Sequence, residues 1–562
     1  MSTATPLILD LAVAHAKQNP DRVFFTQPVG QGQVIDTTWG QVFDEAARMA
    51  AHLRSLGLPR GARVAMLSKN CAHFITAELA IWMAGGCTVA IFPTERAETV
   101  RYVLEHAEAS LLFVGKLDDW PAQREGVPEG LPCIALPLAP ESAAGLPRWN
   151  DIVARTPPLA TPLQRSEDEL AMLLYTSGST GTPKGVMTSF GAITRAGQGI
   201  AADVRQRVGA GQTNRMLSYL PLAHSFERSW VEAASLVDGG THLFFAESID
   251  TFMADLQRAR PTLFISVPRL WLKFQQGVFA KMPPAKLDRL LRIPLLGGIV
   301  RRKVLKGLGL DAVVQAGSGS APLPPELILW YRKLGLRLFE GYGMSEDNSY
   351  SHSSNEAHGE AGWVGVPMPG VQCKLSPEGE ILIKSPGQCS GYFKEPELTA
   401  ASFTEDGFFR TGDLGEQRPD GLLRISGRVK ELFKTAKGKY VAPAPIENRL
   451  NAHPMLEMSM VSGVGQQAAF ALVVLAERLR PTQHEAPTRA AVQVALERLL
   501  DDLNARLPDA EQLHTLVVAR EAWSIESGLL TPTMKIRRAR IEALVEGELP
   551  NWYARRGVQW QD

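Results

Sequence analysis

The sequence predicts an α/β protein: a large, multi-subdomain N-terminal domain with layered α/β sheets and a small β-barrel-like part, then a small α+β C-terminal domain. Two observations carry this prediction. Short apolar runs alternate with amphipathic stretches over most of the 562 residues, the order expected when helices cover a parallel sheet. From Glu380 to Leu423 short strands and turns replace that alternation, which returns after about Lys430. We therefore expect a change of architecture between the two domains.

The first elements are predicted to be helix, strand and helix, at residues 6–18, 34–38 and 39–56. The first is amphipathic, the second alternates, and the third has apolar residues at helical spacing with Gly57 as its stop. A strand, a helix and a strand are then expected at 63–68, 71–84 and 87–92. Residues 118–162 are rich in Pro and Ala, and we expect them to form a loose segment on the surface.

The alternation is predicted to continue in five short strands, at residues 170–175, 215–220, 242–245, 263–267 and 312–315. Asp406-Gly407 and Asp420-Gly421 are hairpin signals in the strand-rich part. Near the C-terminus, strands at 470–475 and 516–518 are expected on either side of a helix at 489–507. The sequence has no repeat period and no heptad pattern, which excludes solenoids and coiled coils.

The composition limits the kinds of partner. Lys and Arg number 59 and so do Asp and Glu, so nothing in the net charge favours nucleic acid, and a small molecule is the expected partner. The five cysteines form no CxxC pair, which argues against a disulfide scaffold or a zinc cluster. The first residues lack a basic segment followed by an apolar one, so we expect a cytoplasmic protein. The longest apolar stretch, residues 79–93, contains two glycines and is shorter than the ~20 residues that span a bilayer.

One segment carries a clear chemical signal. Residues 175–185, YTSGSTGTPKG, directly follow an apolar run. Glycines let backbone N–H groups turn inward, hydroxyls add hydrogen-bond donors, and Lys184 adds a cation, all of which suit a polyphosphate. The segment is not a Walker A loop, because no Gly-Lys pair is followed by Ser or Thr. The alternative is a flexible linker, although linkers seldom follow a buried strand.

This segment resembles the phosphate loop of the adenylate-forming superfamily, which includes acyl-CoA synthetases, peptide-synthetase adenylation domains and beetle luciferases. The resemblance covers about residues 40–540, and within it SYLPLAHSFER, GKYVAP and LTPTMKIRR are most similar to the long-chain fatty acyl-CoA synthetases. Seven further segments follow in the family's order: residues 218–224, 317–323, 340–346, 392–394, 411–413, 427–428 and 530–535.

The resemblance implies a two-step reaction. A fatty acid and ATP give acyl-AMP and pyrophosphate, and the thiol of coenzyme A then displaces AMP. The phosphates would be bound by Thr176, Ser177, Gly178, Ser179, Thr180, Gly181 and Lys184. Thr176 and Glu346 would hold Mg²⁺, which prefers hard oxygen ligands.

The same resemblance implies the rest of the nucleotide site. Tyr342 would stack on adenine, with Glu340, Gly341, Ser320 and Ser345 lining the pocket. Ser320 stands where Gly or Ala is usual and Ser345 where Thr is usual.

A carboxylate offers two acceptors to the ribose hydroxyls, and Asp413 is expected in that role with Arg428 as a donor beside it. In isolation an Asp in a Thr-Gly-Asp turn is more often a simple turn former, so this role depends on the resemblance to the family.

Three residues are the candidates for the chemistry itself. Lys535 would neutralise negative charge that develops as acyl-AMP forms, together with Lys184 in the loop. His224 would orient the acid; the alternative is a hydrogen-bonded histidine of the core.

Four aromatic residues are either candidates to line an acyl tunnel or ordinary core residues. They are Phe226, Trp230, Phe264 and Trp271.

The family places a hinge at Lys430, which implies domains at residues 1–429 and 430–562, the second of them mobile. After adenylation the small domain would rotate, and the segment with Lys434, Lys437 and Gly438 would meet the pantetheine arm of CoA. Two other functions remain open: an acyl-AMP ligase that serves a carrier protein, and a non-catalytic binding module. A homodimer and a peripheral contact with the inner face of the membrane are also left open.

Overall fold

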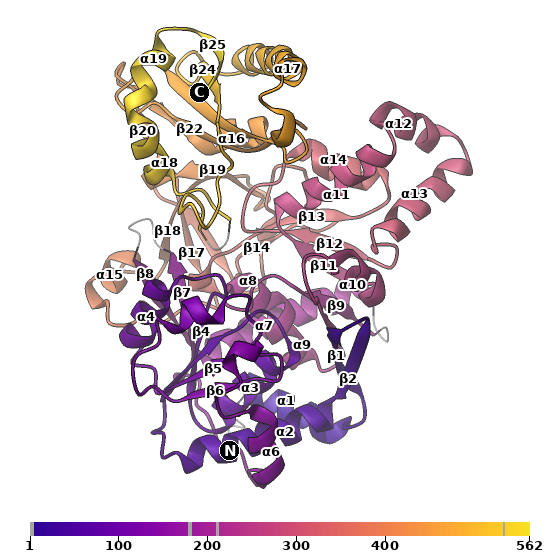
Figure 1. Ribbon diagram of the computed structural model, residues 1–562, viewed down its shortest axis with the longest axis vertical. Coiled ribbons are helices and arrows are strands. Elements are labelled where there is room, and N and C mark those ends of the chain that lie inside the picture. The colour runs from indigo at the N-terminus through magenta and orange to yellow at the C-terminus, as the bar shows by residue number, and fades with distance from the viewer. Residues whose placement is uncertain (1–4, 178–181, 210–212, 532–533, 562) are drawn as a thin grey trace.

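The computed structural model describes residues 5–177, 182–209, 213–531 and 534–561. Figure 1 shows the N-terminal elements at the bottom and the C-terminal elements gathered at the top, above the sheets of the preceding chain. The helices before residue 430 are α1 (Ile8–Gln18), α2 (Trp39–Ser55), α3 (Ala72–Met83), α4 (Ala97–His106), α5 (Trp120–Arg124), α6 (Trp149–Arg155), α7 (Phe190–Val208), α8 (Ser225–Glu227), α9 (Ala234–Asp238), α10 (Phe252–Ala259), α11 (Pro268–Lys281), α12 (Pro284–Arg292), α13 (Leu296–Gly307), α14 (Pro325–Lys333) and α15 (Pro396–Ser402).

The first sheet has six strands in the order β6-β5-β3-β4-β7-β8. The strands before β8 run parallel, and β8 returns antiparallel to β7. Most side chains of the central strands are buried, as expected when helices cover both faces of a parallel sheet. The bounds are β3 (Arg63–Leu67), β4 (Cys87–Ile91), β5 (Leu111–Val114), β6 (Cys133–Ala135), β7 (Leu170–Ser177) and β8 (Pro183–Ser189).

The second sheet joins the beginning of the chain to its middle. Its order is β2-β1-β10-β9, and β1 pairs antiparallel with β2 but parallel with β10. Phe25 of β1 lies opposite Leu243 of β10. The bounds are β1 (Val23–Gly30), β2 (Gln33–Thr38), β9 (Arg215–Ser218) and β10 (His242–Phe245).

The third sheet has the order β11-β12-β13-β14-β15, with the first three strands parallel. Its core includes the buried Phe264, Trp271 and Tyr331, and α11 and α14 pack against it. The bounds are β11 (Leu263–Ser266), β12 (Gln315–Ser318), β13 (Leu338–Tyr342), β14 (His352–Ser353) and β15 (Val366–Pro367).

The part predicted to be barrel-like is an open antiparallel sheet of four strands, β16-β17-β18-β19. Its strands are β16 (Gln372–Leu375), β17 (Glu380–Lys384), β18 (Phe409–Gln417) and β19 (Leu423–Arg428). Gly407 and Gly421 adopt positive φ values of 82° and 88° in the turns that the Asp-Gly pairs predicted. Within the described residues its edge strands do not meet, so the strands were predicted but no barrel closes.

The C-terminal elements have cores of their own, with Ile446, Leu496 and Leu516 in one and Phe470, Trp523 and Trp552 in the other. The sheet order is β22-β23-β24-β25, beside a small β20-β21 hairpin. The bounds are β20 (Phe433–Lys434), β21 (Tyr440–Val441), β22 (Leu456–Ser462), β23 (Ala469–Leu475), β24 (Leu513–Val518), β25 (Gly557–Trp560), α16 (Pro443–Asn451), α17 (Ala486–Asn504), α18 (Arg538–Val545) and α19 (Leu549–Tyr553).

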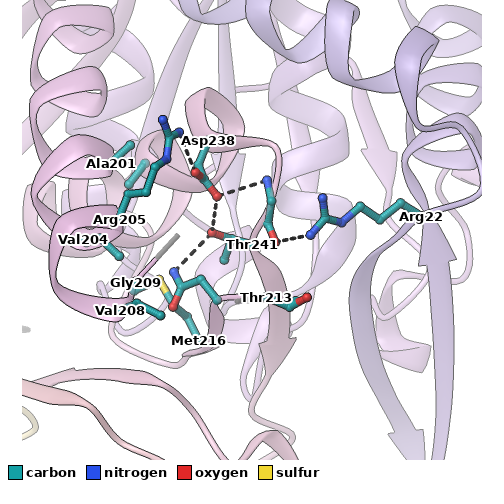
Figure 2. Close-up of a pocket in the computed structure, with 13 residues that line it drawn as sticks. Arg22, Ala201, Val204, Arg205, Val208, Gly209, Thr213, Met216, Asp238 and Thr241 are labelled. Atoms are coloured by element: carbon teal, nitrogen blue, oxygen red, sulfur yellow. Dashed lines mark hydrogen bonds and ion pairs between the residues drawn. The ribbon is translucent and has the colours of Figure 1, made fainter. Parts of the chain in front are cut away.

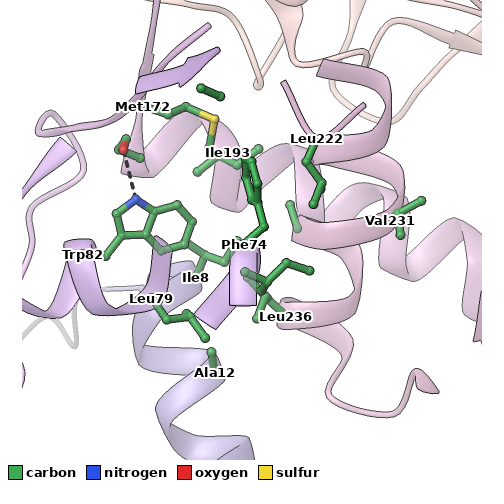
Figure 3. Packing of buried hydrophobic residues seen from close by; sticks show 14 of the residues in the cluster. Ile8, Ala12, Phe74, Leu79, Trp82, Met172, Ile193, Leu222, Val231 and Leu236 are labelled. Carbon is green, nitrogen blue, oxygen red and sulfur yellow. Dashed lines mark hydrogen bonds between the residues drawn. The ribbon is translucent and has the colours of Figure 1, made fainter. Parts of the chain in front are cut away.

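The main core lies between the first sheet and the helices around it (Figure 3). Trp82 packs there beside Phe74, and its indole N–H donates to the carbonyl of Ala171, 2.9 Å away. Helix α3 is buried on nearly every side, which explains why its sequence is apolar all round rather than amphipathic.

Residues 118–162 are more ordered than predicted. They contain α5 and α6, and β6 extends the edge of the first sheet beside β5. The prediction of a loose segment was wrong because β6 has only three residues, too few for a periodic pattern to show in the sequence.

Candidate functional site

The predicted phosphate loop lies at the tip of the β7–β8 hairpin. Thr176 and Lys184 are paired across the two strands, and Ser177 pairs with Pro183. Gly178, Ser179, Thr180 and Gly181 lie outside the described residues. The antiparallel pairing therefore brings the first and last predicted phosphate contacts together at one end of the sheet.

Tyr392 links Lys184 to Glu346. The Lys184 Nζ lies 5.8 Å from the centroid of the Tyr392 ring, and the Tyr392 hydroxyl donates to Oε1 of Glu346 at 2.7 Å. The backbone supports this contact, since the N–H of Phe393 donates to the carbonyl of Gly185 at 2.8 Å. The sequence pointed to the segment but gave Tyr392 no role.

Asp413 is the centre of a second cluster. One carboxylate oxygen accepts from the Tyr342 hydroxyl at 2.7 Å and the other from Nε of Arg428 at 2.6 Å. Asp413 on β18 and Arg428 on β19 are directly paired in the sheet. Burial and the Asp413 charge raise the pKa of Tyr342, and the same charge raises the pKa of Arg428. The structure thus joins three residues that the sequence assigned to the nucleotide.

Glu340 holds the backbone beside this cluster. Its carboxylate accepts from the N–H groups of Leu323 and Gly362, at 2.9 and 3.3 Å. Burial raises its pKa to about 7. Ser320 has a φ of 68°, a left-handed conformation that glycine adopts most easily, at the position where the family usually has Gly or Ala. Gly341 follows Glu340 on β13, opposite Ser353.

His224 caps the N-terminus of the short helix α8. Its Nδ1 accepts from the N–H of Phe226 at 3.1 Å, which leaves Nε2 to carry the proton. Burial, with a contribution from the Lys535 charge, lowers the pKa of His224 to about 3, so the ring is neutral at ordinary pH. Ser345 is connected to this helix because its hydroxyl donates to that of Ser225 at 3.2 Å.

Lys535 reaches the same region from the C-terminal domain. Although its side chain keeps an exposed surface, the protein around it and the Arg428 charge lower its pKa, against the attraction of Asp413, Glu431 and Glu346. Lys535 also acts on His224. Lys535 is therefore within electrostatic reach of candidates on distant parts of the chain, Asp413, Glu346 and His224.

Asn70 organises the segment that leads to His224, and it lies outside the motifs that predicted the site. Its Nδ2 donates to the Ser218 hydroxyl at 2.8 Å and to the Leu220 carbonyl at 2.7 Å, and its Oδ1 accepts from the N–H of Leu222 at 3.1 Å. A lone Asn after a strand gives no sequence signal for such a role.

A fully buried group of charges follows His224. Arg228 forms ion pairs with Glu78 and Glu232, and the neighbouring Glu227 accepts from Asn70 at 3.3 Å. Burial raises the pKa of Glu227 to about 8 and that of Glu78 well above its usual value. Residues 228–233 form a π-helix, a local distortion that is frequent at functional sites.

The predicted hinge residue and the residues predicted to meet CoA lie elsewhere. Lys430 is on a 3₁₀ turn after β19, and Lys434, Lys437 and Gly438 are on the β20–β21 hairpin, where Gly438 has a φ of 75°. In the described part of the chain, no hydrogen bond or ion pair connects these four residues to Asp413 or Glu346. The arrangement thus brings the Lys535 segment, and not this hairpin, to the cluster.

The four aromatic candidates separate into two pairs. Phe264 and Trp271 are fully buried in the core of the third sheet. Phe226 and Trp230 are half-buried, and the Trp230 indole donates to the carbonyl of Ser349 at 3.0 Å. Phe226 and Trp230 are therefore the pair that lies beside α8.

A cavity of about 370 Å³ opens between α7, α9 and β9, away from these clusters (Figure 2). Its polar side chains hold one another: Asp238 pairs with Arg205 and accepts from Thr241, while Arg22 donates to the carbonyl of Gly240. Among the residues that the structure describes, no predicted site residue lines it. Separately, none of the described helices is both long and apolar enough to cross a membrane.

Comparison with known proteins identifies family models and relatives that match most of the chain. The AMP-binding enzyme family matches residues 13–393, and the AMP-binding enzyme C-terminal domain matches residues 431–557. The chain is 30% identical to "Long-chain-fatty-acid--CoA ligase FadD15" of Mycobacterium bovis, over 93% of each chain. It is 28% identical to "Long-chain-fatty-acid--CoA ligase 1" of Homo sapiens, over 87% of this chain and 78% of the human one.

Solved structures share the fold. The adenylation domain of carboxylic acid reductase from Segniliparus rugosus, in complex with AMP and a co-purified carboxylic acid, has a TM-score of 0.80 at 21% identity, with 98% of this chain and 95% of that one covered. The anthranilate CoA ligase AuaEII, in complex with anthranoyl-AMP, has a TM-score of 0.78 at 19% identity, with 97% and 98% covered. Both have the mixed α/β architecture described above.

Proposed function

We propose, from the premise that this chain belongs to the AMP-binding enzyme family, that it is an AMP-forming acid–thiol ligase, a long-chain-fatty-acid–CoA ligase. It joins a fatty acid to ATP to make acyl-AMP and pyrophosphate, and then passes the acyl group to CoA. The name of the relatives that match over most of their length supports the long-chain acid as substrate.

One observation carries this function. Asp413 joins Tyr342 and Arg428 in one hydrogen-bonded cluster, and the charges of Asp413, Arg428 and Glu346 all act on the pKa of Lys535 from the C-terminal domain. A cation held there stabilises negative charge as it develops on the reacting phosphate. Tyr342, Asp413 and Arg428 bind the adenosine, and Lys184 with the β7–β8 hairpin binds the phosphates.

In the first step, a carboxylate oxygen of the acid attacks the α-phosphorus of ATP, and pyrophosphate leaves with the electrons of the broken P–O bond. Neutral His224 donates through Nε2 to the carboxylate and orients it. Lys535 and Lys184 offset the charge that builds on the phosphates.

Thr176 and Glu346 are suited to hold Mg²⁺, because a hydroxyl and a carboxylate supply hard oxygen ligands. Glu346 has one oxygen engaged by Tyr392, which leaves the other for the ion. When bound, the ion neutralises phosphate charge. Tyr392 fixes the Glu346 carboxylate in position beside Lys184.

In the second step, the sulfur of the CoA thiol attacks the acyl carbonyl and the C–O bond to the AMP phosphate breaks. AMP leaves with the electrons of that bond, and the thiol proton is released. Because the residues that serve CoA lie apart from the cluster, we propose that the domain at 430–562 rotates about Lys430 relative to residues 1–429. Rotation would withdraw Lys535 and bring Lys434, Lys437 and Gly438 to the pantetheine arm. The separate matches at 13–393 and 431–557 support this division.

We also propose a cytoplasmic enzyme in peripheral contact with the inner face of the membrane, because its acid substrates partition into bilayers. A homodimer is the proposed assembly, on the resemblance to the family alone.

The function is tested by incubating the protein with ATP, Mg²⁺ and acids from acetate to a twenty-carbon acid, with and without CoA. Pyrophosphate and acyl-CoA are both measured. We expect CoA-dependent turnover that is highest with long-chain acids. Acyl-AMP that forms but never passes to CoA would instead make the protein an acyl-AMP ligase, and no pyrophosphate with any acid would exclude both.

A further inference from the structure

Helices α12 and α13 form a hairpin that projects from the third sheet, at the upper right of Figure 1. Leu287 is fully buried at its base, and Leu291, Val300 and Val304 pack against the core that contains Trp271. Packing against this core therefore explains the apolar inner face of the hairpin. The same packing does not explain the side chains on its outer face and at its tip.

The outer surface of the hairpin is strongly basic. Residues 281–306 contain eight basic residues and one acidic residue, in a chain that carries no net charge as a whole. All eight basic side chains belong to exposed residues, and none forms an ion pair with another described residue. They are Lys281, Lys286, Arg289, Arg292, Arg301, Arg302, Lys303 and Lys306.

The tip between the two helices is apolar and exposed. Leu295 is 91% exposed and Ile299 is 64% exposed, with Ile293 and Leu296 beside them at 47% and 38%. Large apolar side chains exposed together in this way mark an interaction site.

The exposure of this tip is built into its backbone. Leu295 has a φ of 65°, a strained conformation for a residue with a side chain. The N–H of Gly297 donates to the carbonyl of Ile293 at 2.8 Å, and a Cβ at Gly297 would approach the carbonyl oxygen of Leu291 to 2.5 Å. The tight turn thus requires glycine at 297 and holds Leu295 outward.

We propose that the α12–α13 hairpin docks this enzyme on an anionic lipid bilayer, with Leu295 and Ile299 inserted among the acyl chains and the basic side chains against the headgroups. Basic residues near such a surface are attracted to it, and an apolar tip gains free energy by burial in the interface. Nucleic acid would use the charge but offer no apolar layer for the tip. The proposal names the surface for the peripheral contact proposed above, on which it rests.

The test is co-sedimentation of the full chain with vesicles of phosphatidylcholine, with and without phosphatidylglycerol. We expect binding to the anionic vesicles that weakens as salt is added, because exposed charges are screened. The double variant Leu295→Glu/Ile299→Glu should abolish it. Each basic residue near the surface contributes ~1 kcal/mol to binding, and 1.4 kcal/mol corresponds to about tenfold in affinity. Replacing both Arg302 and Lys303 by Gln should therefore weaken binding about tenfold or more.

Matched control residues are available. Ile249 is 93% exposed and Leu544 is 63% exposed, close to the values for Leu295 and Ile299, and both lie outside the hairpin. The double variant Ile249→Glu/Leu544→Glu should bind vesicles like the unaltered protein. Equal loss in both double variants would overturn the proposal, since any added charge would then suffice.

Three other results would also overturn it: no binding to anionic vesicles, equal binding to neutral ones, or a hairpin variant that turns a dimer into a monomer while it still binds vesicles. The last result would make the tip an interface between two copies of the chain. Turnover of an acid supplied in detergent separates this proposal from the function itself. The hairpin variants should keep that turnover, whereas a failure of the proposed function would remove it in every variant, including the unaltered chain.

Discussion

At the scale of single residues, the site depends on side chains whose charge is set by their surroundings. His224 is neutral because burial lowers its pKa to about 3, while Lys535 has its pKa lowered by the protein around it and by Arg428. The charge of Lys535 also acts on His224 across the boundary between the two domains. A change at either residue should therefore affect acyl-AMP formation more than thioester formation.

Lys535→Ala should slow acyl-AMP formation by about 10²- to 10³-fold, the usual effect of removing one group that stabilises developing charge. Thioester formation from supplied acyl-AMP should change far less, because the proposed rotation would withdraw the lysine before that step. Arg449→Ala, an exposed cation on α16, is the matched control. Equal loss of both half-reactions would refute the role given to Lys535.

Asn70→Ala should weaken use of the acid without weakening ATP binding. The change removes the donor to Leu220 and the acceptor for Leu222, so the segment before His224 loses its anchor. We expect KM for the acid to rise and kcat to fall, with KM for ATP unchanged. Loss of these buried hydrogen bonds should lower the free energy of unfolding by about 1–3 kcal/mol.

Asn70→Asp provides the partial rescue, because its carboxylate still accepts from Leu222 but has no N–H to donate. Asn551→Ala, on an exposed helix residue, should have no effect. A parallel rise in KM for ATP would show that Asn70 has only a general structural role.

The contiguous part of the site was accessible to sequence reasoning, and the rest was not. Lys184, Asp413 and Lys535 lie in short motifs that keep their order along the chain. Asn70, in contrast, is 148 residues from Ser218, and only the folded sheet brings the two together. Tyr392 was missed for the same physical reason, since its contact with Glu346 depends on how β8 meets a distant turn.

At the scale of elements, regular helices and strands were predicted well. The helix expected at 39–56 is α2, and its start is fixed by Thr38 and Gln41, each of which hydrogen-bonds to the backbone of the other. In the described part of the chain the region predicted to be barrel-like is an open sheet, and the surface segment at 118–162 proved to contain helices and an edge strand. The π-helix at 228–233 could not be predicted, because its period differs from that of the α-helix.

Glu227→Gln should stabilise the protein at alkaline pH. Folding raises the pKa of Glu227 from about 4.5 to about 8, so the folded state keeps a proton that the unfolded state releases between these values. Stability should therefore fall as pH rises through this window. Glutamine does not titrate, keeps the acceptor for Asn70 and removes this loss, so the variant should gain on the order of 1–3 kcal/mol at pH 8.

Urea unfolding at pH 5 and pH 8 measures this effect. The gain from Glu227→Gln should be smaller at pH 5, and Glu129→Gln, at an exposed position, should show none at either pH. A variant that gained equally at both pH values would contradict a buried, protonated Glu227.

At the scale of the whole molecule, ion pairs hold the C-terminal domain in its present orientation. Glu457 of β22 accepts from Arg269 of α11 and also from Arg480 of its own domain. Lys273 and Glu477 form a second contact between the domains at 3.5 Å. These contacts favour the arrangement in which Lys535 reaches Asp413.

Glu457→Gln should shift the balance away from this arrangement. Loss of a pair worth about 1 kcal/mol should slow acyl-AMP formation about fivefold and leave thioester formation from supplied acyl-AMP unchanged or faster. Glu477→Gln removes the other, far more exposed carboxylate and should have a smaller effect. Single-turnover measurements of each half-reaction distinguish these outcomes, and slower thioester formation would count against the orientation role.

The pairing of β1 with β10 also affects how the protein can be made. Val23–Gly30 leaves the ribosome long before its parallel neighbour His242–Phe245 has been translated. Until then the β1–β2 hairpin presents an unpaired edge, which is a template for association with other chains. Synthesis at low temperature or with a chaperone that covers such edges should raise the soluble yield, and fragments that stop before residue 242 should aggregate.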